Sequence, residues 1–304
     1  MRTPVSSIGL PVLLLLLVLP AVPLPAVPQS ASIPQSWIHH VSSIPCVDPE
    51  TGLSFSPLGL AFDVEGDLYV VDADNSKILV AADLAPDLTV FAGCPQGLQA
   101  CQFVDIEADA GWFYVSERSG GLVVALDSKG APVFETQVGA DIGGIGLGAA
   151  GLVYGAMTLS GSIVVADVYG VKTPILCPIS GGADGSYPVD CLVEKSGKVL
   201  VTDAFSKKVL ILSLLGHPEG NLAGFEFKSP FGLAAFLDRL VLVSDSELGC
   251  IAVYDSQGKF RGTFGQDHLR TPAFIDVRDD GTVCVADPGK MTIEVFHIES
   301  VQGE

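Results

Sequence analysis

Short apolar strands separated by polar turns recur along the chain from Pro57 to the C-terminus. In each copy an apolar strand, about six residues of turn and a second apolar strand follow one another. The strand pairs are 69–72 with 78–80, 114–116 with 122–124, 156–157 with 163–165, 201–203 with 209–211, 243–245 with 251–253, and 285–287 with 293–295. The repeat is about 43 residues long, and a period of this size with strand-type patterning indicates a radial β array rather than a helical repeat.

Each copy contains enough short strands for a four-stranded sheet. An innermost strand begins near Pro57 in the first copy and Pro230 in the fifth, and a turn rich in Gly and Asp follows it. A second hairpin leads into a fourth strand. The second and third strands are apolar on both faces, which is typical of a sheet packed between two others. The sequence therefore predicts an all-β, six-bladed β-propeller with four-stranded antiparallel blades.

Ring closure has its own pattern. The sixth copy ends soon after the strand at 292–296 and lacks a fourth strand of its own. An orphan segment, Trp37–Val41, lies upstream of the first copy and has a strand-like composition. We expect it to supply the outer strand of the last blade, because a shared strand removes a free edge and joins the two ends of the domain.

The first 31 residues have the layout of a secretory signal peptide. Arg2 gives a positive start, an apolar stretch runs from Ile8 to Leu19, and small residues follow. A signal-anchor helix is the alternative, but several prolines disfavour a stable spanning helix. The prediction is a signal peptide at 1–31, a propeller at 37–304 and an exported protein, periplasmic or secreted, without a membrane span after signal removal.

Export changes the interpretation of the seven cysteines. In an oxidising compartment closely spaced pairs are disulfide candidates. We expect Cys94 to pair with Cys101, and Cys177 with Cys191, each closing a loop between repeats. The remaining three cysteines, Cys46, Cys250 and Cys284, leave at least one thiol free.

The chain is strongly acidic, with 35 acidic and 16 basic residues and a net charge of −19. Such a surface repels phosphate backbones and anionic headgroups, so nucleic acid is a poor partner.

The repeated motif also has a family resemblance. The motif consists of Pro-x-Gly followed by an aliphatic residue and Ala, then a turn glycine, an apolar strand that ends in Asp, and a second aliphatic strand. Over residues 57 to 297 it resembles the NHL repeat. Copies one and five match best. The resemblance implies a six-bladed NHL-type propeller, but it implies little about function, because this fold hosts many activities.

Candidate functional residues lie on the loop face, which is built from the loops entering each innermost strand and the turns between second and third strands. Asp105 and Asp190 replace the motif glycine in copies two and four, at the predicted channel mouth. They could share a Ca²⁺ ion, or they could be solvated carboxylates at the rim. Other acidic residues end the second strands, where an Asx-type turn is the usual role.

Two enzyme families with this type of fold offer sharper alternatives. Gluconolactonase-type proteins hold a divalent metal with carboxylate and Asn ligands, but their recurring motifs are absent here. Peptidyl-amidating lyases use His-bound zinc, yet of the five histidines only His268 is expected on the loop face. Three converging imidazoles are not available for a zinc site.

The sequence thus favours an exported binding module that recognises a protein, peptide or glycan through its loop face. The alternative is a lactonase-like, metal-dependent hydrolase or lyase with a divalent cation at the channel mouth. The predicted ligand-binding residues are Asp105, Asp190, Glu117, Arg118, Asp267, His268 and Arg270, with Asp105 and Asp190 as metal ligands in the alternative. Convergent carboxylates in a polar cavity would favour an enzyme, whereas scattered charges and exposed aromatic side chains would favour a binding module.

Overall fold

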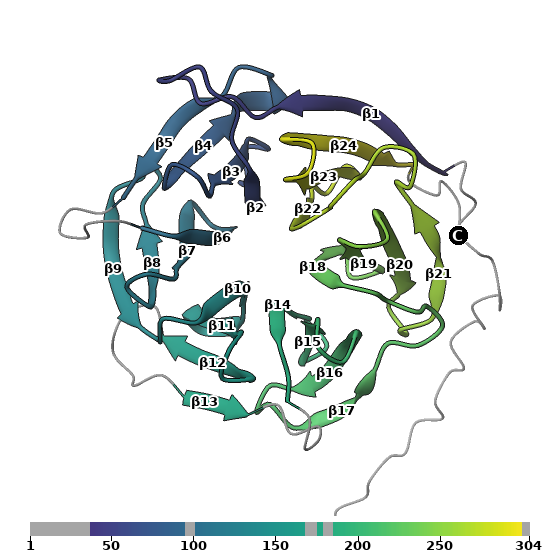
Figure 1. Cartoon of the computed structure of the whole chain (residues 1–304). Helices are drawn as coiled ribbons and strands as arrows, with labels where there is room; N and C mark the ends of the chain where they lie inside the picture. Colours follow the sequence, from purple (N-terminus) through teal and green to yellow (C-terminus); the bar gives the residue numbers. More distant parts are fainter. Residues whose placement is uncertain (1–36, 95–100, 168–174, 179–184, 300–304) are drawn as a thin grey trace, which may run out of the picture. The chain divides into compact units, whose positions relative to one another are not determined.

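The structure is a computed structural model that describes residues 37–94, 101–167, 175–178 and 185–299 of the 304. The chain divides into two units, Met1–Ala31 and Ser32–Glu304. The first unit, which contains the predicted signal peptide, lies outside the described residues. In the second unit the described strands form six four-stranded antiparallel sheets arranged as blades around a common centre, towards which the innermost strands face (Figure 1). We call the surface formed by these innermost strands the channel wall. The predicted fold class is confirmed.

Blades 1 to 3 follow one another in sequence, each running from the innermost to the outermost strand. Their strands are β2 (Pro57–Phe62), β3 (Leu68–Asp72), β4 (Lys77–Ala81) and β5 (Thr89–Gly93); β6 (Phe103–Asp109), β7 (Trp112–Glu117), β8 (Leu122–Leu126) and β9 (Pro132–Gln137); and β10 (Ile142–Leu147), β11 (Leu152–Met157), β12 (Ser162–Asp167) and β13 (Ile175–Pro178). Two short 3₁₀ turns, η2 (Ala82–Leu84) and η3 (Ala149–Gly151), lie between strands.

Blades 4 to 6 repeat this order, and the last blade takes its outer strand from the beginning of the chain. Their strands are β14 (Pro188–Val193), β15 (Lys198–Asp203), β16 (Lys208–Ser213) and β17 (Pro218–Asn221); β18 (Pro230–Phe236), β19 (Leu240–Asp245), β20 (Cys250–Asp255) and β21 (Phe260–Phe264); and β22 (Ile275–Val277), β23 (Thr282–Asp287), β24 (Thr292–Ile298) and β1 (Ile38–Pro45).

Strand β1 closes the ring as predicted. It pairs antiparallel with β24, from Ile38 opposite Ile298 to Pro45 opposite Thr292, and Figure 1 shows it along the outside of the last blade. A buried carboxylate fastens this joint. Glu294 on β24 accepts hydrogen bonds from Ser43 (2.6 Å) on β1 and from Lys290 (2.5 Å), and its carboxylate lies 2.7 Å from the His40 ring.

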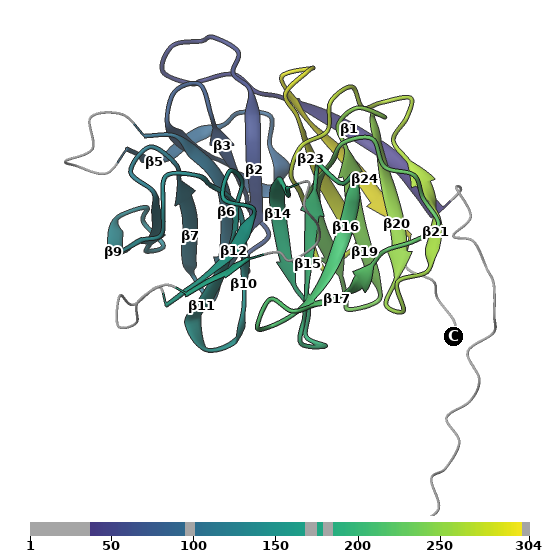
Figure 2. The same ribbon diagram turned by 60° about the horizontal axis from the view of Figure 1, so that its bottom comes forward.

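The core lies between the blades. The middle strands are buried on both faces; all five residues of β3 and of β8 are buried, for example. The hydrophobic clusters therefore join neighbouring sheets, as where Tyr69 of blade 1 packs on Phe113 of blade 2 at 4.2 Å between ring centroids. Figure 2 shows the strands running between two faces of the ring: the loop face, and a hairpin face made by the turns between first and second strands.

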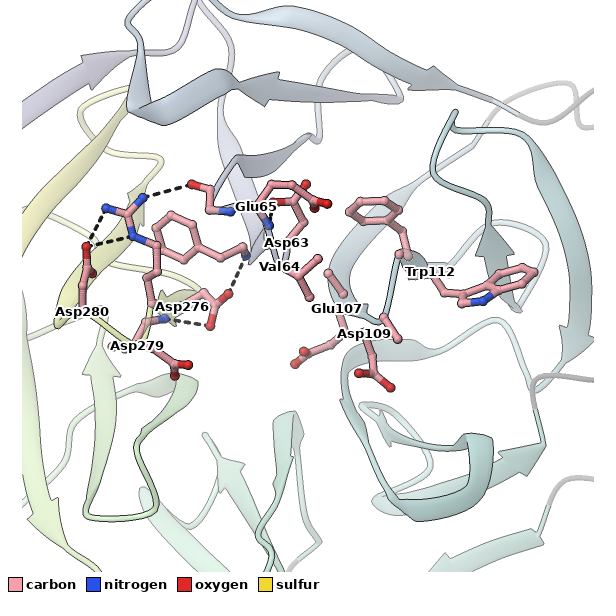
Figure 3. Close-up of a pocket in the computed structure, with 17 residues that line it drawn as sticks. Asp63, Val64, Glu65, Glu107, Asp109, Trp112, Asp276, Asp279 and Asp280 are labelled. Atoms are coloured by element: carbon pink, nitrogen blue, oxygen red, sulfur yellow. Dashed lines mark hydrogen bonds and ion pairs between the residues drawn. The ribbon is translucent and has the colours of Figure 1, made fainter.

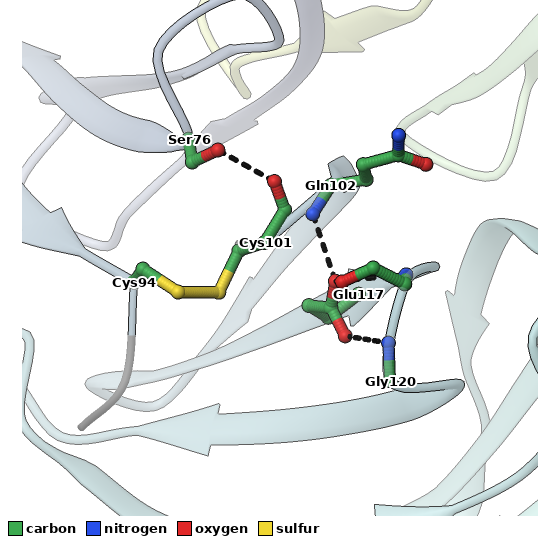
Figure 4. The surroundings of a disulfide bond; sticks show 7 residues. Ser76, Cys94, Cys101, Gln102, Glu117 and Gly120 are labelled. Carbon is green, nitrogen blue, oxygen red and sulfur yellow. Dashed lines mark hydrogen bonds between the residues drawn. A yellow bond between two sulfur atoms is a disulfide. The ribbon is translucent and has the colours of Figure 1, made fainter. Parts of the chain in front are cut away.

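One of the two predicted disulfides is present. Cys94 and Cys101 are bonded, and Ser76 donates a 2.5 Å hydrogen bond to the Cys101 carbonyl beside them (Figure 4). Disulfides are typical of oxidising, extracytoplasmic settings. Among the residues that the structure describes, no helix has the length and apolar character needed to cross a membrane.

The second predicted disulfide, Cys177 with Cys191, is wrong. Cys191 is a buried free thiol on β14, the innermost strand of blade 4, and its Sγ lies 3.3 Å from the Tyr154 carbonyl. Cys177 belongs to β13, the outermost strand of blade 3. The two positions are close in sequence, but they lie on the outermost strand of one blade and the innermost strand of the next.

Candidate functional site

Buried carboxylates hold the turns of the loop face. Five of them end second strands and accept backbone N–H groups from the turn that follows or from the loop that enters the blade: Asp72, Glu117, Asp203, Asp245 and Asp287. The predicted Asx-type role is confirmed for Asp72, Asp203 and Asp245. Asp287 instead accepts the Arg270 and Thr271 N–H groups of the entering loop. Glu117, which the sequence suggested as a ligand-binding residue, is fully buried and accepts from Gln102 (2.8 Å) and Gly120 (2.6 Å), as Figure 4 shows.

In blade 3 the corresponding turn is held by a residue that the sequence did not single out. Its second strand ends in Met157, which has no carboxylate. Asp141, from the loop that enters the blade, accepts the N–H groups of Leu159 (3.2 Å) and Ser160 (2.8 Å) instead. The signal was present in the sequence as an acidic residue just before the innermost strand.

Asp105 and Asp190 are buried in the channel wall rather than solvated at its rim, each with 3% of its surface exposed. Each joins its own blade to the next. The Asp105 carboxylate accepts the Ile145 N–H of blade 3 at 2.9 Å, and the Asp190 carboxylate accepts the Leu233 N–H of blade 5 at 2.8 Å. The structure thus assigns both carboxylates to bonds between blades.

A third carboxylate completes this pattern. Asp276 of blade 6 accepts the Phe62 N–H of blade 1 at 2.6 Å, so blades 2, 4 and 6 each reach the following blade. The odd-numbered blades carry glycine at the motif position. A Cβ on Gly144 would lie 2.2 Å from Oδ1 of Asp190, and one on Gly59 would lie 2.5 Å from Cα of Asp105. Glycine is therefore required where the innermost strands approach most closely.

The channel-wall carboxylates are protonated more readily than usual. Burial raises the pKa of Asp105 to about 8 and that of Asp276 to about 6. Burial, together with the neighbouring carboxyls of Asp105, Asp276 and Asp190, also raises the pKa of Glu107 well above its ordinary value. These acidic groups therefore lie in one electrostatic environment although they come from three blades.

A polar cavity opens on the hairpin face, opposite the face that the sequence favoured. It has a volume of about 680 Å³ and lies among blades 1, 2 and 6 (Figure 3). Its acidic lining residues are Asp63, Glu65, Glu107, Asp109, Asp276, Asp279 and Asp280. Trp112 lies at its edge, and Arg278 donates to Asp280 (2.8 Å) and to the Gly66 carbonyl (3.1 Å). The sequence showed the turn residues Glu65, Asp279 and Asp280 but not their convergence.

The other predicted residues are spread over two blades. Arg118 of blade 2 donates to the Ile142 carbonyl of blade 3 at 3.0 Å. Asp267, His268 and Arg270 lie on the exposed connection into blade 6. His268 stacks on the His40 ring with centroids 4.0 Å apart, and Arg270 donates to the Gly289 carbonyl. The structure does not bring these residues together with Asp105 and Asp190 into one site.

The described part of the chain contains no group of three or more His, Cys, Asp or Glu side chains arranged to hold a metal ion. Asp105 and Asp190 therefore lack further ligands of these types, and a hard cation would need oxygen ligands from elsewhere.

Exposed apolar side chains stand on the loop face. Four lie in turns between second and third strands, and the fifth precedes β14: Leu159, Phe205, Leu248, Met291 and Tyr187. Their exposed fractions run from 40% for Leu248 to 79% for Leu159. These five side chains are distributed over the loop-face turns of blades 3 to 6. Contiguous exposed apolar groups mark recognition surfaces.

The sequence matches no protein-family model, and a search of curated proteins gave no match. Solved structures do match. A streptogramin B lyase is 13% identical with a TM-score of 0.65, covering 88% of this chain and 100% of that one. A chain of a nidogen–laminin complex is 18% identical with a TM-score of 0.59 (72% and 84% covered). The WD40 propeller domain of Doa1 is 9% identical with a TM-score of 0.63 (86% and 98% covered).

These matches include a lyase as well as a protein solved in a complex with another protein. At such identities the likeness concerns the fold, and activity has to be argued from the site. The specific NHL-repeat family is not confirmed, because no family model matches. The comparisons and the strand order agree on one conclusion: this chain has the six-bladed β-propeller fold.

Proposed function

We propose that the protein is an exported binding module that recognises a macromolecular ligand, a protein, peptide or glycan, through its loop face. The observation that carries this proposal is the set of exposed apolar side chains on loop-face turns, of which those with Phe205 and Leu248 are held in place by the buried carboxylates of Asp203 and Asp245. A preorganised surface loses little conformational entropy when it binds. The similarity to a chain of a nidogen–laminin complex is compatible with this role.

Photo-crosslinking from matched positions tests the choice of face. A photoreactive phenylalanine would replace Phe205 on the loop face or Leu215 on the hairpin face; these side chains are 56% and 73% exposed. Each protein would be irradiated with the extracellular fraction of its source organism. We expect discrete crosslinked products from position 205 only. Equal products from both positions, or products from position 215 alone, would contradict the proposal.

A second candidate is a hydrolase or lyase acting in the hairpin-face cavity. The cavity favours it, because about 680 Å³ suits a small molecule and Glu107 lies within the lining with a raised pKa. A further solved structure that matches, a catalytically inactive virginiamycin B lyase from Staphylococcus aureus with quinupristin (11% identical, TM-score 0.64), makes quinupristin a reasonable first probe. Loss of intact quinupristin by liquid chromatography, abolished in Glu107→Gln, would support this candidate.

Measuring the metal content tests whether this second candidate is a metal-dependent enzyme. Elemental analysis of the purified mature protein, with thermal unfolding measured with and without a chelator, is the experiment. A bound divalent ion whose removal lowers the melting temperature would favour the enzyme. A protein without metal that is indifferent to chelation would remove the metal-dependent hypothesis.

A further inference from the structure

One buried carboxylate positions two exposed aromatic residues on the loop face of blade 4. Asp203 is 2% exposed, and it accepts the Tyr187 N–H at 2.8 Å and the Phe205 N–H at 3.1 Å. Ser206 and Ser186 donate to the same carboxylate through their hydroxyls. The backbone that carries both aromatic side chains is therefore fixed, although Tyr187 and Phe205 are 45% and 56% exposed.

A hollow lined by lysines lies beside these aromatic residues, between blades 4 and 5. It has a volume of about 330 Å³, and its lining includes Lys207, Lys208 and Lys228 together with Asn221, Phe225 and the exposed Glu226. Within the described ranges none of the three lysine amines forms an ion pair. Because the chain has 16 basic against 35 acidic residues, three amines around one hollow form a local reversal of its charge.

The lysines are joined to the apolar groups through the backbone and through buried carboxylates. Asp245 accepts the Lys228 N–H at 2.7 Å and the Leu248 N–H at 3.0 Å, just as Asp203 fixes Tyr187 and Phe205. Lys208 lies opposite Asp203 in the pairing of β15 with β16. We define the blade 4–5 rim by its exposed residues: Tyr187, Phe205, Lys207, Lys208, Lys228 and Leu248.

We propose that the blade 4–5 rim binds an acidic polypeptide segment, with carboxylates on the lysines and an apolar side chain on Tyr187 and Phe205. This proposal rests on the loop-face binding function proposed above and names the class of its ligand. Aromatic side chains such as Tyr187 are enriched in protein-binding hot spots, and charges at the rim of an interface guide the approach and orientation of a partner of opposite charge. Leu248, an aliphatic group without polar atoms, favours a polypeptide over a glycan.

Charge explains why the partner would bind here and not elsewhere. A protein of net charge −19 repels an acidic segment over most of its surface. The lysine hollow is a local exception, so it would direct the acidic segment to this rim and fix its orientation. Because the amines are exposed, binding should weaken as the salt concentration rises.

Selection from a random peptide display library tests the proposal and does not require the identity of the partner. The library would be selected on the mature protein, and the enriched peptides would be synthesised and titrated by fluorescence anisotropy. The test variant is Lys208→Glu/Lys228→Glu, which leaves Lys207 untouched because its backbone has a φ of 56°. The control variant is Lys129→Glu/Lys198→Glu, two exposed lysines at the hairpin-face ends of strands in blades 2 and 4, and melting temperatures confirm that both variants fold.

We expect enriched peptides that combine Asp or Glu with apolar residues, bound about tenfold more weakly by the test variant and unchanged by the control. Phe205→Ser should weaken the same peptides. Peptides that depend on Phe205 but not on the lysines would overturn this proposal and leave loop-face binding intact. Peptides whose binding depends neither on Phe205 nor on the lysines would contradict both this proposal and the proposed loop-face binding function. Heparin binding that the test variant loses, without peptide binding, would indicate an anionic glycan and overturn the polypeptide assignment.

Discussion

The carboxylate of Asp105 accepts the backbone N–H of Ile145 at 2.9 Å, across the boundary between blades 2 and 3. The two residues are forty positions apart, and neither strand could make this bond within its own sheet. Because Asp190 and Asp276 make the equivalent bonds, side chains tie the inner strands together at three of the blade boundaries. The residues that the sequence singled out as candidate metal ligands therefore serve the integrity of the ring.

Removing the Asp105 side chain should destabilise the protein. In Asp105→Ala the buried Ile145 N–H loses its acceptor, and a buried unsatisfied donor costs about 1–3 kcal/mol of unfolding free energy. Asp105→Asn keeps an acceptor oxygen and resembles the protonated acid, so we expect a loss below about 1 kcal/mol. Urea unfolding followed by circular dichroism measures both. Equal losses in the two variants would show that the hydrogen bond is not what Asp105 contributes.

Asp105 and Asp276 should also make the folded protein less stable as the pH rises. A folded-state pKa of about 8 for Asp105 and about 6 for Asp276 lies above the value of the unfolded chain, so the folded state binds protons more tightly. Their contribution to stability is therefore complete below about pH 4 and is lost as the pH rises towards 8. We expect the melting temperature of the wild type to fall over this interval.

Asp105→Asn provides the control for this pH dependence, because an amide does not titrate. The fall in melting temperature between pH 5 and 8 should be smaller in this variant than in the wild type. The other acids of the channel wall, Glu107, Asp190 and Asp276, remain and would account for what is left. Parallel curves for the two proteins would refute the assignment of this pH dependence to Asp105.

The comparison of sequence and structure shows where periodicity is informative. The repeat predicted the blades, and the missing fourth strand predicted the role of β1, because both follow from burying strands on two faces. Bonds between blades do not follow from the repeat. In copy six Asp276 follows the motif position, whereas in copy two Asp105 occupies it. Alignment of the copies therefore does not reveal that the two residues share a role.

The candidate site was less predictable than the fold for a similar reason. The cavity on the hairpin face gathers residues from blades 1, 2 and 6, and its shape depends on how far each turn projects. Linear spacing also misled the second disulfide prediction, because Cys191 lies on an innermost strand and Cys177 on an outermost one. Spacing within one connection was a sufficient guide only for Cys94 and Cys101.

Ring closure should depend on Glu294. Its carboxylate is fully buried, and hydrogen bonds from Lys290, Ser43, Thr292 and His40 outweigh burial and lower its pKa to about 2. Glu294→Gln should lower the free energy of unfolding at pH 7 by about 2 kcal/mol, since Lys290 loses its only oppositely charged partner among the described residues and keeps neutral acceptors such as the His268 carbonyl. Glu299→Gln is the control, because Glu299 and His39 are both more than half exposed and should contribute little.

The pH dependence of the Glu294 effect distinguishes charge from shape. A lowered folded-state pKa gives stability that is present above about pH 4.5 and is lost as the pH falls towards 2. The difference between wild type and Glu294→Gln should therefore shrink over this interval. A difference that persists unchanged at pH 2 would mean that packing, rather than the carboxylate charge, holds the closing strand.

The cysteines give a chemical test of the connections between blades. Non-reducing peptide mapping should find Cys94 joined to Cys101, and alkylation of the native protein should leave the buried Cys191 unlabelled until denaturant is added. Closing a loop with a sequence separation of 7 stabilises the folded state by about 2 kcal/mol through the entropy of the unfolded chain. Cys94→Ser/Cys101→Ser should therefore unfold at lower urea, and the wild type in dithiothreitol should match it. Labelling of Cys94 in native protein that has not been reduced would contradict the assignment.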